Sequence, residues 1–415
     1  GTKFLEQAKA AANQALALST ADIAARVSNE AELLAAVASG KEGLIVLEAD
    51  IVMSENQTIK LQDGQSLVGA AYFNPGKQTS LTFNISGSNQ DGIQAAENSL
   101  LSDFTINYHT DTQNLSSGAI VVKDVKNVVV QNLDIFIDSS YNTKTTSPVS
   151  GIRCIRGEVT LRGINNIDSK ANYRAYAVVA DGDQTIVNIE GIFNLRTRGD
   201  FSFGIMSAGN AQVNLKQGMT LNADSASYSL IVMRQGNIRG ERDITINANH
   251  CFFAEGGSGP TYGGNSFYFA GGTHINMTNA YFAYLNKSEN INPNPGYNGN
   301  ALIMEAGVQI TWQNENDSGT WINSAPTALD VTSTTRFTPA DLTGMTKISA
   351  NGPVLPNIDD EMAKKKLPVD GYKEDYSQQE QQYNQLLLQY DMLISDASYK
   401  GINLLEGQYL KINFN

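Results

Sequence analysis

The sequence predicts a mainly β protein built around a right-handed parallel β-helix at residues 41–352. Three observations lead to this fold class. From Leu44 onward, apolar and polar residues alternate in short runs, and each run ends at Asn, Asp or Gly. A strand that begins with a small residue and Ile, then a turn, then a Val-x-Val or Ile-x-Ile strand recurs about every 24 to 37 residues. Hairpin turns of the Asn-Gly kind do not join consecutive runs, which argues against a sandwich or a barrel.

The repeat predicts which side chains lie inside the coils. A single coil cannot bury its inward side chains, whereas stacked coils bury them in a continuous column. The alternation assigns Ile, Val, Leu, Phe and Met to the inside and polar residues to the outside. Asn recurs near strand ends, where we expect it to stack with the Asn of neighbouring coils. The residues concerned are Asn107, Asn132, Asn166 and Asn247.

Helical patterns flank the repeat on both sides. Residues 1–40 predict one helix from Phe4 to Leu16 and a second that follows the cap candidates Ser19, Thr20 and Asp22. This second helix should run through Ile23 and Val27 to Val37 and end at Gly40. Residues 353–371 form a Pro-rich linker, and residues 372–415 predict a further helix and a short strand. We expect the helices at the two ends to pack together, and the chain to be a piece of a longer protein.

Charge and composition exclude several classes of partner. The formal net charge is −13, and only 17% of the residues are charged. Such a surface repels nucleic acid and anionic lipid, and no apolar run approaches the roughly 20 residues that span a bilayer. Two cysteines and three well-separated histidines give no metal-ligand spacing, so we expect no metal and no cofactor. Nucleic-acid and membrane partners are therefore not expected.

The C-terminal segment carries a motif that resembles a known family. An amphipathic helix pattern leads into Asp396-Ala397-Ser398-Tyr399-Lys400-Gly401-Ile402-Asn403-Leu404-Leu405 and then into the strand-like run 409–414. This string resembles the end of the inner-domain (D1) helix of bacterial flagellins. The helix from Phe4 to Leu16 resembles the preceding D1 helix. The alternative is that both helices only cap the ends of the β-helix.

The resemblance covers about 60 of the 415 residues and implies a location and partners. It implies a β-helix inserted between two helices that ordinary flagellins connect by a short loop. The parent protein would then assemble with other flagellin-like subunits, and the chain would be extracellular, on a bacterial flagellum or cell surface. The terminal segments with which flagellins polymerise are missing from this sequence, so the chain alone should not form a filament.

Two functions follow as expectations. The first is a non-enzymatic, surface-exposed domain of a flagellin-like filament protein, with a structural role or an adhesive one in which it contacts polysaccharide or host surface glycan. The alternative is a polysaccharide lyase or glycoside hydrolase displayed on the flagellum. A phage-tailspike-like receptor binder is a third interpretation, which the flagellin-like ends disfavour.

A catalytic site on this fold would need carboxylates and a base gathered in one groove. Hydrolases use paired carboxylates, and lyases use Ca²⁺ held by Asp or Glu beside an Arg or Lys base, so Ca²⁺ is expected only under the lyase alternative. The sequence lacks the motifs of pectate lyases and polygalacturonases. The weak candidates for catalysis are Asp181, Asp183, Asp200, Glu255, Glu305, Arg153 and Arg198, with Asp224 and Arg234 also considered.

A group of tyrosines near the long loops is the candidate for sugar binding, because exposed aromatic rings stack on sugars. Its members are Tyr262, Tyr268, Tyr281, Tyr284 and Tyr297. The alternative is that some of these rings cover loops. The string Arg198-Gly199-Asp200 matches an integrin-binding tripeptide, but its position at a strand end favours a plain structural role.

Overall fold

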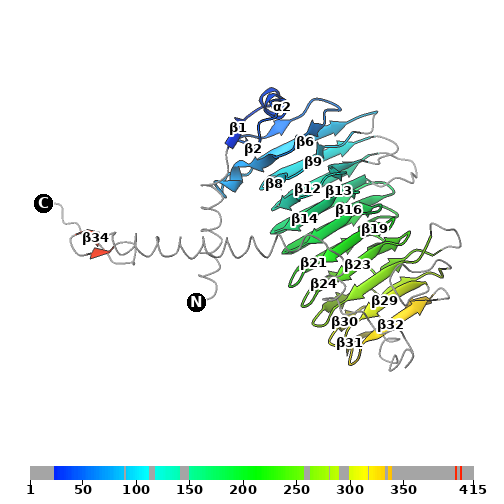
Figure 1. Cartoon of the computed structure of the whole chain (residues 1–415). Coiled ribbons are helices and arrows are strands. Elements are labelled where there is room, and N and C mark those ends of the chain that lie inside the picture. Colours follow the sequence, from blue (N-terminus) through cyan, green and yellow to red (C-terminus); the bar gives the residue numbers. More distant parts are fainter. Residues whose placement is uncertain are drawn as a thin grey trace. The chain divides into compact units, whose positions relative to one another are not determined.

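The computed structural model describes residues 23–87, 90–111, 117–140, 149–256, 262–279, 281–288, 299–315, 317–331 and 335–338, and the pairs 398–399 and 402–403. The chain divides into two compact units, residues 22–355 and residues 1–21 with 356–415. The larger unit is a parallel β-helix, in which strands from successive coils lie side by side (Figure 1). The fold class predicted for the repeat is therefore confirmed.

Each coil contributes one strand to each of three sheets. Sheet A contains β1 (Ile23–Val27), β2 (Gly43–Leu47), β5 (Gln65–Gly69), β8 (Leu100–Ser102), β11 (Val128–Gln131), β14 (Glu158–Arg162), β17 (Ile186–Ile189), β20 (Gln212–Leu215), β23 (Asn237–Gly240), β26 (Ser266–Phe269), β29 (Asn300–Met304) and β32 (Thr327–Val331). Sheet B contains β3 (Ile51–Val52), β6 (Ser80–Ile85), β9 (Thr105–Thr110), β12 (Asp134–Ser139), β15 (Ile164–Lys170), β18 (Ile192–Arg198), β21 (Thr220–Ser225), β24 (Thr245–Ala248), β27 (His274–Met277), β30 (Gln309–Gln313) and β31 (Ser318–Ile322). Sheet C contains β4 (Ile59–Lys60), β7 (Ile93–Gln94), β10 (Gly118–Lys123), β13 (Val149–Ile155), β16 (Ala175–Asp181), β19 (Phe203–Ala208), β22 (Tyr228–Met233), β25 (Phe252–Ala254), β28 (Ala283–Leu285) and β33 (Thr335–Phe337). A short 3₁₀ helix, η1 (Ala70–Tyr72), follows β5.

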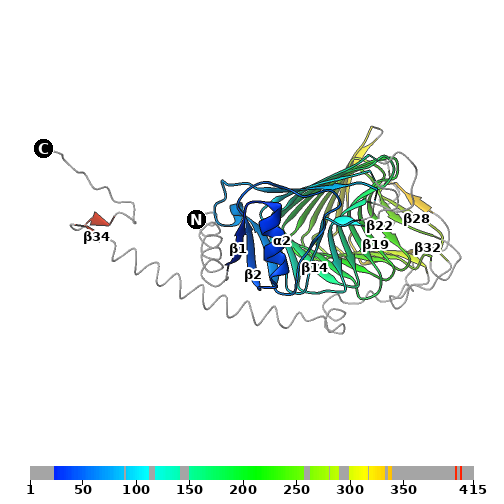
Figure 2. The same cartoon turned by 90° about the horizontal axis from the view of Figure 1, so that it is seen from above.

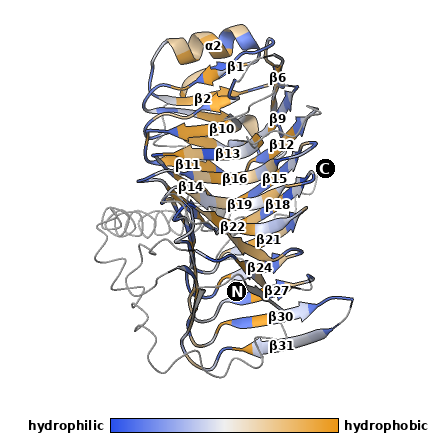
Figure 3. Cartoon of the chain, turned by 90° about the vertical axis from the view of Figure 1, so that its right-hand side faces the viewer, coloured by the Kyte–Doolittle hydropathy of each residue, from blue (hydrophilic) through white to orange (hydrophobic). Residues whose placement is uncertain are grey.

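The period-two alternation separates the core from the surface. In β12, Ile135 and Ile137 are buried, whereas Phe136 between them is 47% exposed. The parallel register stacks Ile135 on Ile167 of β15 and Leu195 of β18. Such columns repeat along the stack, where hydrophobic stretches recur from strand to strand (Figure 3). Burial of these columns supplies the main stabilising free energy of the solenoid.

Both ends of the solenoid are closed by elements that break the parallel pattern. Helix α2 (Glu30–Ala38) lies over the first coils (Figure 2), with Leu33 and Val37 buried and Gln65 Nε2 donating to the Val37 carbonyl over 3.1 Å. At the other end, β31, β32 and β33 each pair antiparallel with the last parallel strand of their sheet. A solenoid needs such caps because an open end exposes apolar side chains and unpaired backbone groups.

The second predicted helix is correct only in its last part. Residues Ile23–Val27 form β1, which pairs parallel with β2, and the helix begins after Asn29. The Asn29 side chain accepts a hydrogen bond from Glu32 N over 3.0 Å, so Asn29 is the N-cap in place of Ser19, Thr20 or Asp22. The sheet edge decides this difference, because β2 offers backbone partners to a segment that also has helical periodicity.

The predictions for the two ends of the chain fall largely outside the described residues. This applies to the helix from Phe4 to Leu16, to the linker 353–371, to the helix from Lys373 and to the strand-like run 409–414. Within the flagellin-like motif, β34 (Ser398–Tyr399) and β35 (Ile402–Asn403) form an antiparallel pair. The resemblance of the chain ends to flagellin thus stays a prediction.

Candidate functional site

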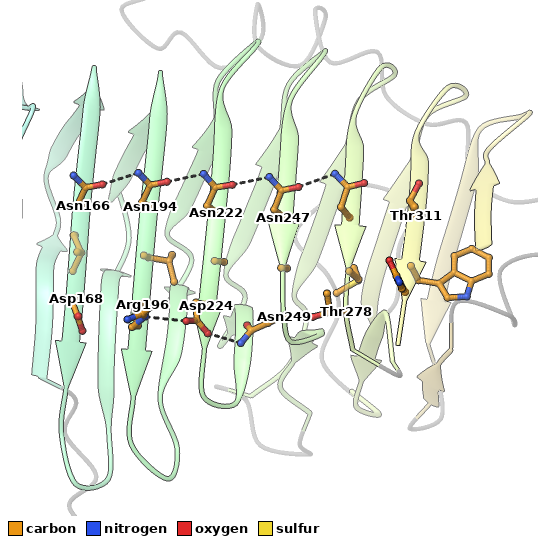
Figure 4. A pocket seen from close by; sticks show the side chains of 18 of the residues that line it. Asn166, Asp168, Asn194, Arg196, Asn222, Asp224, Asn247, Asn249, Thr278 and Thr311 are labelled. Carbon is orange, nitrogen blue, oxygen red and sulfur yellow. Dashed lines mark hydrogen bonds and ion pairs between the residues drawn. The ribbon is translucent and has the colours of Figure 1, made fainter. Parts of the chain in front are cut away.

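The outer face of sheet B carries an open groove of about 630 Å³. It runs across the strands from Phe136 of β12 to Thr311, Trp312 and Gln313 of β30. Figure 4 shows the part from Asn166 to Thr311. Two rows of outward side chains, two residues apart on each strand, form its sides. Its floor is the strand between the rows, at residues such as Leu195 and Ala223, whose side chains are buried in the core. Such a groove is an extended surface for a ligand that lies parallel to the solenoid axis.

The first row is a ladder of asparagines. One Nδ2–H of Asn194 donates to Asn166 Oδ1 over 2.7 Å, and Asn222 donates to Asn194 over 2.7 Å in the same way. Asn247 continues the ladder onto Asn222 over 2.7 Å, and Asn276 continues it onto Asn247 over 2.8 Å. The dashed lines in Figure 4 follow these bonds. Every amide therefore points in the same direction along the solenoid.

The ladder starts at a carboxylate. Asn166 Nδ2 donates to Asp134 Oδ1 over 2.6 Å, so Asp134 occupies the ladder position on the preceding coil. Asn is an unfavourable strand residue, because its side chain competes for backbone groups. Here the parallel register places equivalent amides side by side, and their mutual hydrogen bonds offset that preference. Asn is therefore favourable at this position only because the neighbouring coils supply hydrogen-bond partners for its side chain.

The second row is charged but internally paired. Arg196 Nε donates to Asp224 Oδ2 over 3.0 Å, and Asn249 Nδ2 donates to Asp224 Oδ1 over 2.7 Å. Asp168, beside Arg196 in the register, accepts from Arg198 Nη2 over 2.7 Å. Each carboxylate in the groove thus has an arginine partner. These pairs are partly exposed, so they order the side chains more than they stabilise the fold.

An aromatic residue lies at each end of the groove. Phe136 stands in the second row beside Asp168 and is 47% exposed. At the other end Trp312 is buried, and its indole Nε1–H donates to Asp317 Oδ2 over 3.1 Å. The groove therefore combines a polar central part with an exposed aromatic ring at one end.

Three of the predicted catalytic candidates meet at sheet C, outside this groove. Asp181 ends β16 and accepts from Arg234 Nη2 over 2.8 Å, and Arg234 N donates to Glu255 Oε2 over 3.3 Å. Arg153 on β13 is close enough to Asp181 and Arg234 to interact with both charges. Nε and Nη1 of Arg153 are buried and have no hydrogen-bond partner within the part of the chain that the structure describes.

Burial shifts the acid–base properties of this sheet C cluster. It raises the pKa of Glu255 above the usual value, against the opposing effects of the Arg234 N–H and charge. Burial also lowers the pKa of Arg153, which the charges of Asp181 and Asp91 partly offset. A raised carboxyl pKa is a property of general acids, although structural carboxyls share it.

The remaining catalytic candidates lie apart. Asp183 is exposed and accepts from Asn210 Nδ2 over 2.9 Å, and Asp200 is exposed. Glu305 directly follows β29 of sheet A, and it accepts from the Tyr268 hydroxyl and from Gly271 N, each over 2.7 Å. Arg198 ends β18 and pairs with Asp168 at the edge of the groove. This ion pair is the kind of structural role expected for the Arg198-Gly199-Asp200 string. The candidates thus do not converge on one site.

The predicted tyrosine group is also dispersed. Tyr268 is buried on sheet A under Arg239, whose guanidinium carbon lies 5.3 Å from the ring centroid. Tyr284 is half-buried on sheet C and packs edge-on against Phe253, with ring centroids 5.3 Å apart. Tyr262 and Tyr281 are 47% and 37% exposed, and Tyr297 lies outside the described residues. The tyrosines do not form a common surface on the elements described.

The groove itself could be read only partly from the sequence. The expected stacking of Asn is confirmed for Asn166 and Asn247, which belong to the ladder. It is wrong for Asn107, which donates to Thr82 Oγ1, and for Asn132, which donates to Asp103, each over 3.4 Å. Asn194, Asn222 and Asn276 were missed. The signal was present, because the five ladder residues follow one another at separations of 28, 28, 25 and 29 residues.

The described residues contain no group of three or more His, Cys, Asp or Glu side chains placed to hold a metal ion. No helix in the same residues has the length and apolar character needed to cross a membrane. No protein-family model, curated protein or solved structure matches the chain at a significant level.

Proposed function

We propose that this protein is a non-enzymatic, surface-displayed domain that binds glycan along the sheet B groove. The observation that carries the proposal is the Asn ladder, a column of identical amides that opens into a groove of about 630 Å³. Binding sites for small and extended ligands commonly have this size and place a few polar groups against an apolar floor.

The amides suit sugar hydroxyls. The Nδ2 of each inner Asn, such as Asn222, uses one hydrogen in the ladder, and its Oδ1 accepts one. A carboxamide has two donor hydrogens and two acceptor lone pairs, so one of each is left for a ligand. A hydroxyl both donates and accepts, and it can therefore bridge the remaining donor and acceptor. The ladder also holds the amides in place, which lowers the entropic cost of binding.

The same geometry favours binding over catalysis in the groove. A general acid must carry a proton, whereas Asp224 accepts hydrogen bonds from both Arg196 and Asn249. Asp168 is likewise paired with Arg198. These hydrogen bonds hold the two carboxyl groups in place as acceptors that order the side chains of the groove.

One observation supports a second candidate function, a polysaccharide hydrolase or lyase. Glu255, with its raised pKa, lies beside Arg234 and Asp181 on sheet C, where a general acid and a positive charge would be combined. A lyase would in addition require Ca²⁺. Turnover of neutral or acidic polysaccharides that is abolished by Glu255→Gln would support this candidate. The absence of any product on such a panel would remove it.

We further propose that the domain is displayed on a flagellin-like filament at the bacterial surface, through a longer parent protein. The motif from Asp396 to Leu405 supports this, together with the antiparallel pair β34–β35 that lies within it. We take the solenoid to be right-handed, because crossovers between parallel strands of one sheet almost always have that hand. The partners would be other filament subunits and a polysaccharide or host surface glycan.

Two experiments test the proposal. Screening the full chain against an array of glycans should identify bound polysaccharides, and Asn222→Ala should weaken the binding. Antibodies raised against the solenoid should label filaments on cells of the source organism in electron micrographs. Failure to bind any glycan would refute the binding function, and labelling confined to the cell interior would refute the display.

A further inference from the structure

We infer that the ligand of the sheet B groove is an uncharged, extended polysaccharide that runs parallel to the solenoid axis with about one sugar residue per coil. This inference rests on the glycan-binding function proposed above and narrows it to one ligand class. Three features of the groove carry it: its charge balance, its repeat distance and its exposed aromatic end.

The first feature is the charge balance. The charged residues that line the groove are Asp168, Arg196 and Asp224. Asp224 is paired with Arg196 over 3.0 Å, and Asp168 is paired with Arg198 over 2.7 Å. No cation is left over in the lining for an anionic sugar, and the whole chain has a formal net charge of −13. A polyanionic chain would have to break these pairs and overcome the repulsion, whereas a neutral chain meets neither cost.

The second feature is the repeat distance. Neighbouring strands of a sheet lie about 4.8 Å apart, which is close to the length of one sugar residue in an extended chain. Asn166, Asn194, Asn222, Asn247 and Asn276 present the same amide at successive strands. A polymer of repeating sugars can therefore place one sugar beside each amide, with successive β-1,4-linked sugars presenting alternate edges to the ladder. A branched or compact glycan would match only one or two amides.

The third feature is the length of the groove and its aromatic end. The lining runs from β15 to β30 over six strands, with Phe136 of β12 beyond them, so the part between β15 and β30 is about 24 Å long. This length accommodates about five to six sugar residues. Phe136, which is 47% exposed, can pack against the apolar face of a sugar at that end.

The inference is tested by titrating the full chain with two series of oligosaccharides, from dimer to octamer. One series is neutral, made of β-1,4-linked glucose or N-acetylglucosamine, and the other is oligogalacturonate. Affinity for a neutral series should rise with each added sugar up to the pentamer or hexamer and then level off. It should change little with ionic strength, because no net ion pair forms on binding.

Matched variants connect the affinity to the groove. Phe136→Ala and Asn222→Ala should each weaken the binding of the neutral hexamer about three- to tenfold, which corresponds to one lost contact. Phe201→Ala is the control for the aromatic variant, because Phe201 has the same exposure of 47% and does not line the groove. Circular dichroism of each variant verifies that the coils remain folded.

The outcomes separate this inference from the proposed function. Preference for oligogalacturonate, with an affinity that falls as salt rises, would overturn the inference and leave glycan binding intact. So would an affinity that stops rising at the disaccharide, or equal losses in Phe136→Ala and Phe201→Ala. Absence of binding to every glycan in both series and on the array would overturn the inference together with the proposed function.

Discussion

Replacing Asn222 with alanine removes the central amide of the sheet B ladder and should destabilise the solenoid by about 1–2 kcal/mol. Asn222 donates to Asn194 and accepts from Asn247, each over 2.7 Å. An intramolecular hydrogen bond contributes about 0.5–1.5 kcal/mol net to the free energy of unfolding. Because these amides are half-buried and water can partly replace the lost partners, we expect the loss of two bonds to cost less than the upper limit of that range for each bond. Ala and Asn are both unfavourable in strands, so the change in intrinsic preference is small.

A double-mutant cycle isolates the shared bond. Asn222→Ala and Asn247→Ala each break the hydrogen bond that joins them, so the double variant should lose less stability than the two single variants together. We expect a coupling free energy of about 1 kcal/mol. The matched control pairs Asn222→Ala with Asn214→Ala, because Asn214 donates to Asn188 on sheet A over 2.9 Å and shares no partner with Asn222. That pair should be additive within about 0.5 kcal/mol.

Urea unfolding followed by two probes provides the measurement. Both tryptophans of the chain, Trp312 and Trp321, belong to β30 and β31 at the C-terminal end of the solenoid. Their fluorescence reports on that cap, whereas circular dichroism reports on all coils. If the two transitions coincide and the urea dependence of the unfolding free energy is the same in all variants, their free energies of unfolding can be compared. A coupling near zero would show that the amides bond water as well as they bond each other, and it would refute the account of the ladder.

Further predictions concern coil contacts and buried charge. Gly236→Ala should lower the free energy of unfolding by about 1–3 kcal/mol, because the added Cβ would lie 1.9 Å from Ser207 O. Gly76→Ala is the control: its Cβ would meet only Asn74 Oδ1 at 3.6 Å, and it should leave the melting temperature unchanged in the same thermal melts. Arg153→Met should stabilise the fold by about 1 kcal/mol, since it removes buried N–H groups that have no acceptor among the described residues. A lower melting temperature would instead mean that the guanidinium is satisfied. Burial raises the pKa of Glu255 above its ordinary value of 4.5. The stability that this shift contributes is therefore fully present below pH 4.5 and is lost as the pH rises through the folded-state pKa. Glu255→Gln should therefore reduce the loss of stability between pH 4.5 and neutrality. Hydrogen bonds from Lys77 and, to a smaller extent, Arg26 lower the pKa of Glu48. Glu48→Gln should therefore remove stability that is present above pH 4.5 and is lost as the pH falls. Unchanged pH profiles in both variants would contradict these assignments.

The sequence predicted strands best where every inward residue is a large apolar one. In Val128–Gln131 and Ile186–Ile189 all the buried side chains are Val or Ile, and both segments are strands. The strands β15, β18 and β21 were not recognised. Ser169, Thr197 and Ala223 occupy inward positions in them, and Ile164 and Ile192 occupy exposed outward ones, which weakens the periodic signal.

The same limits apply to the candidate site. Local pattern indicated that Asn166 and Asn247 would stack, because a strand repeat implies equivalent positions on neighbouring coils. The local pattern could not show that Asp224 and Arg196 belong to a groove whereas Asp183 and Asp200 do not, because Asp224 and Arg196 form a pair only through contact between coils. Sequence separation does not reveal such contacts, as Arg234 and Asp181 show by pairing across 53 residues.

By itself, the sequence determined that this chain forms stacked coils and which side chains enter their core. The reason is that burial follows alternation within a few residues, and alternation can be read directly. Only the tertiary structure decided which outward residues meet. Coil length varies, with 25 residues between Asn222 and Asn247 and 29 between Asn247 and Asn276, so the register between coils is set by packing of the whole stack. The amide ladder and the groove beside it are products of that register.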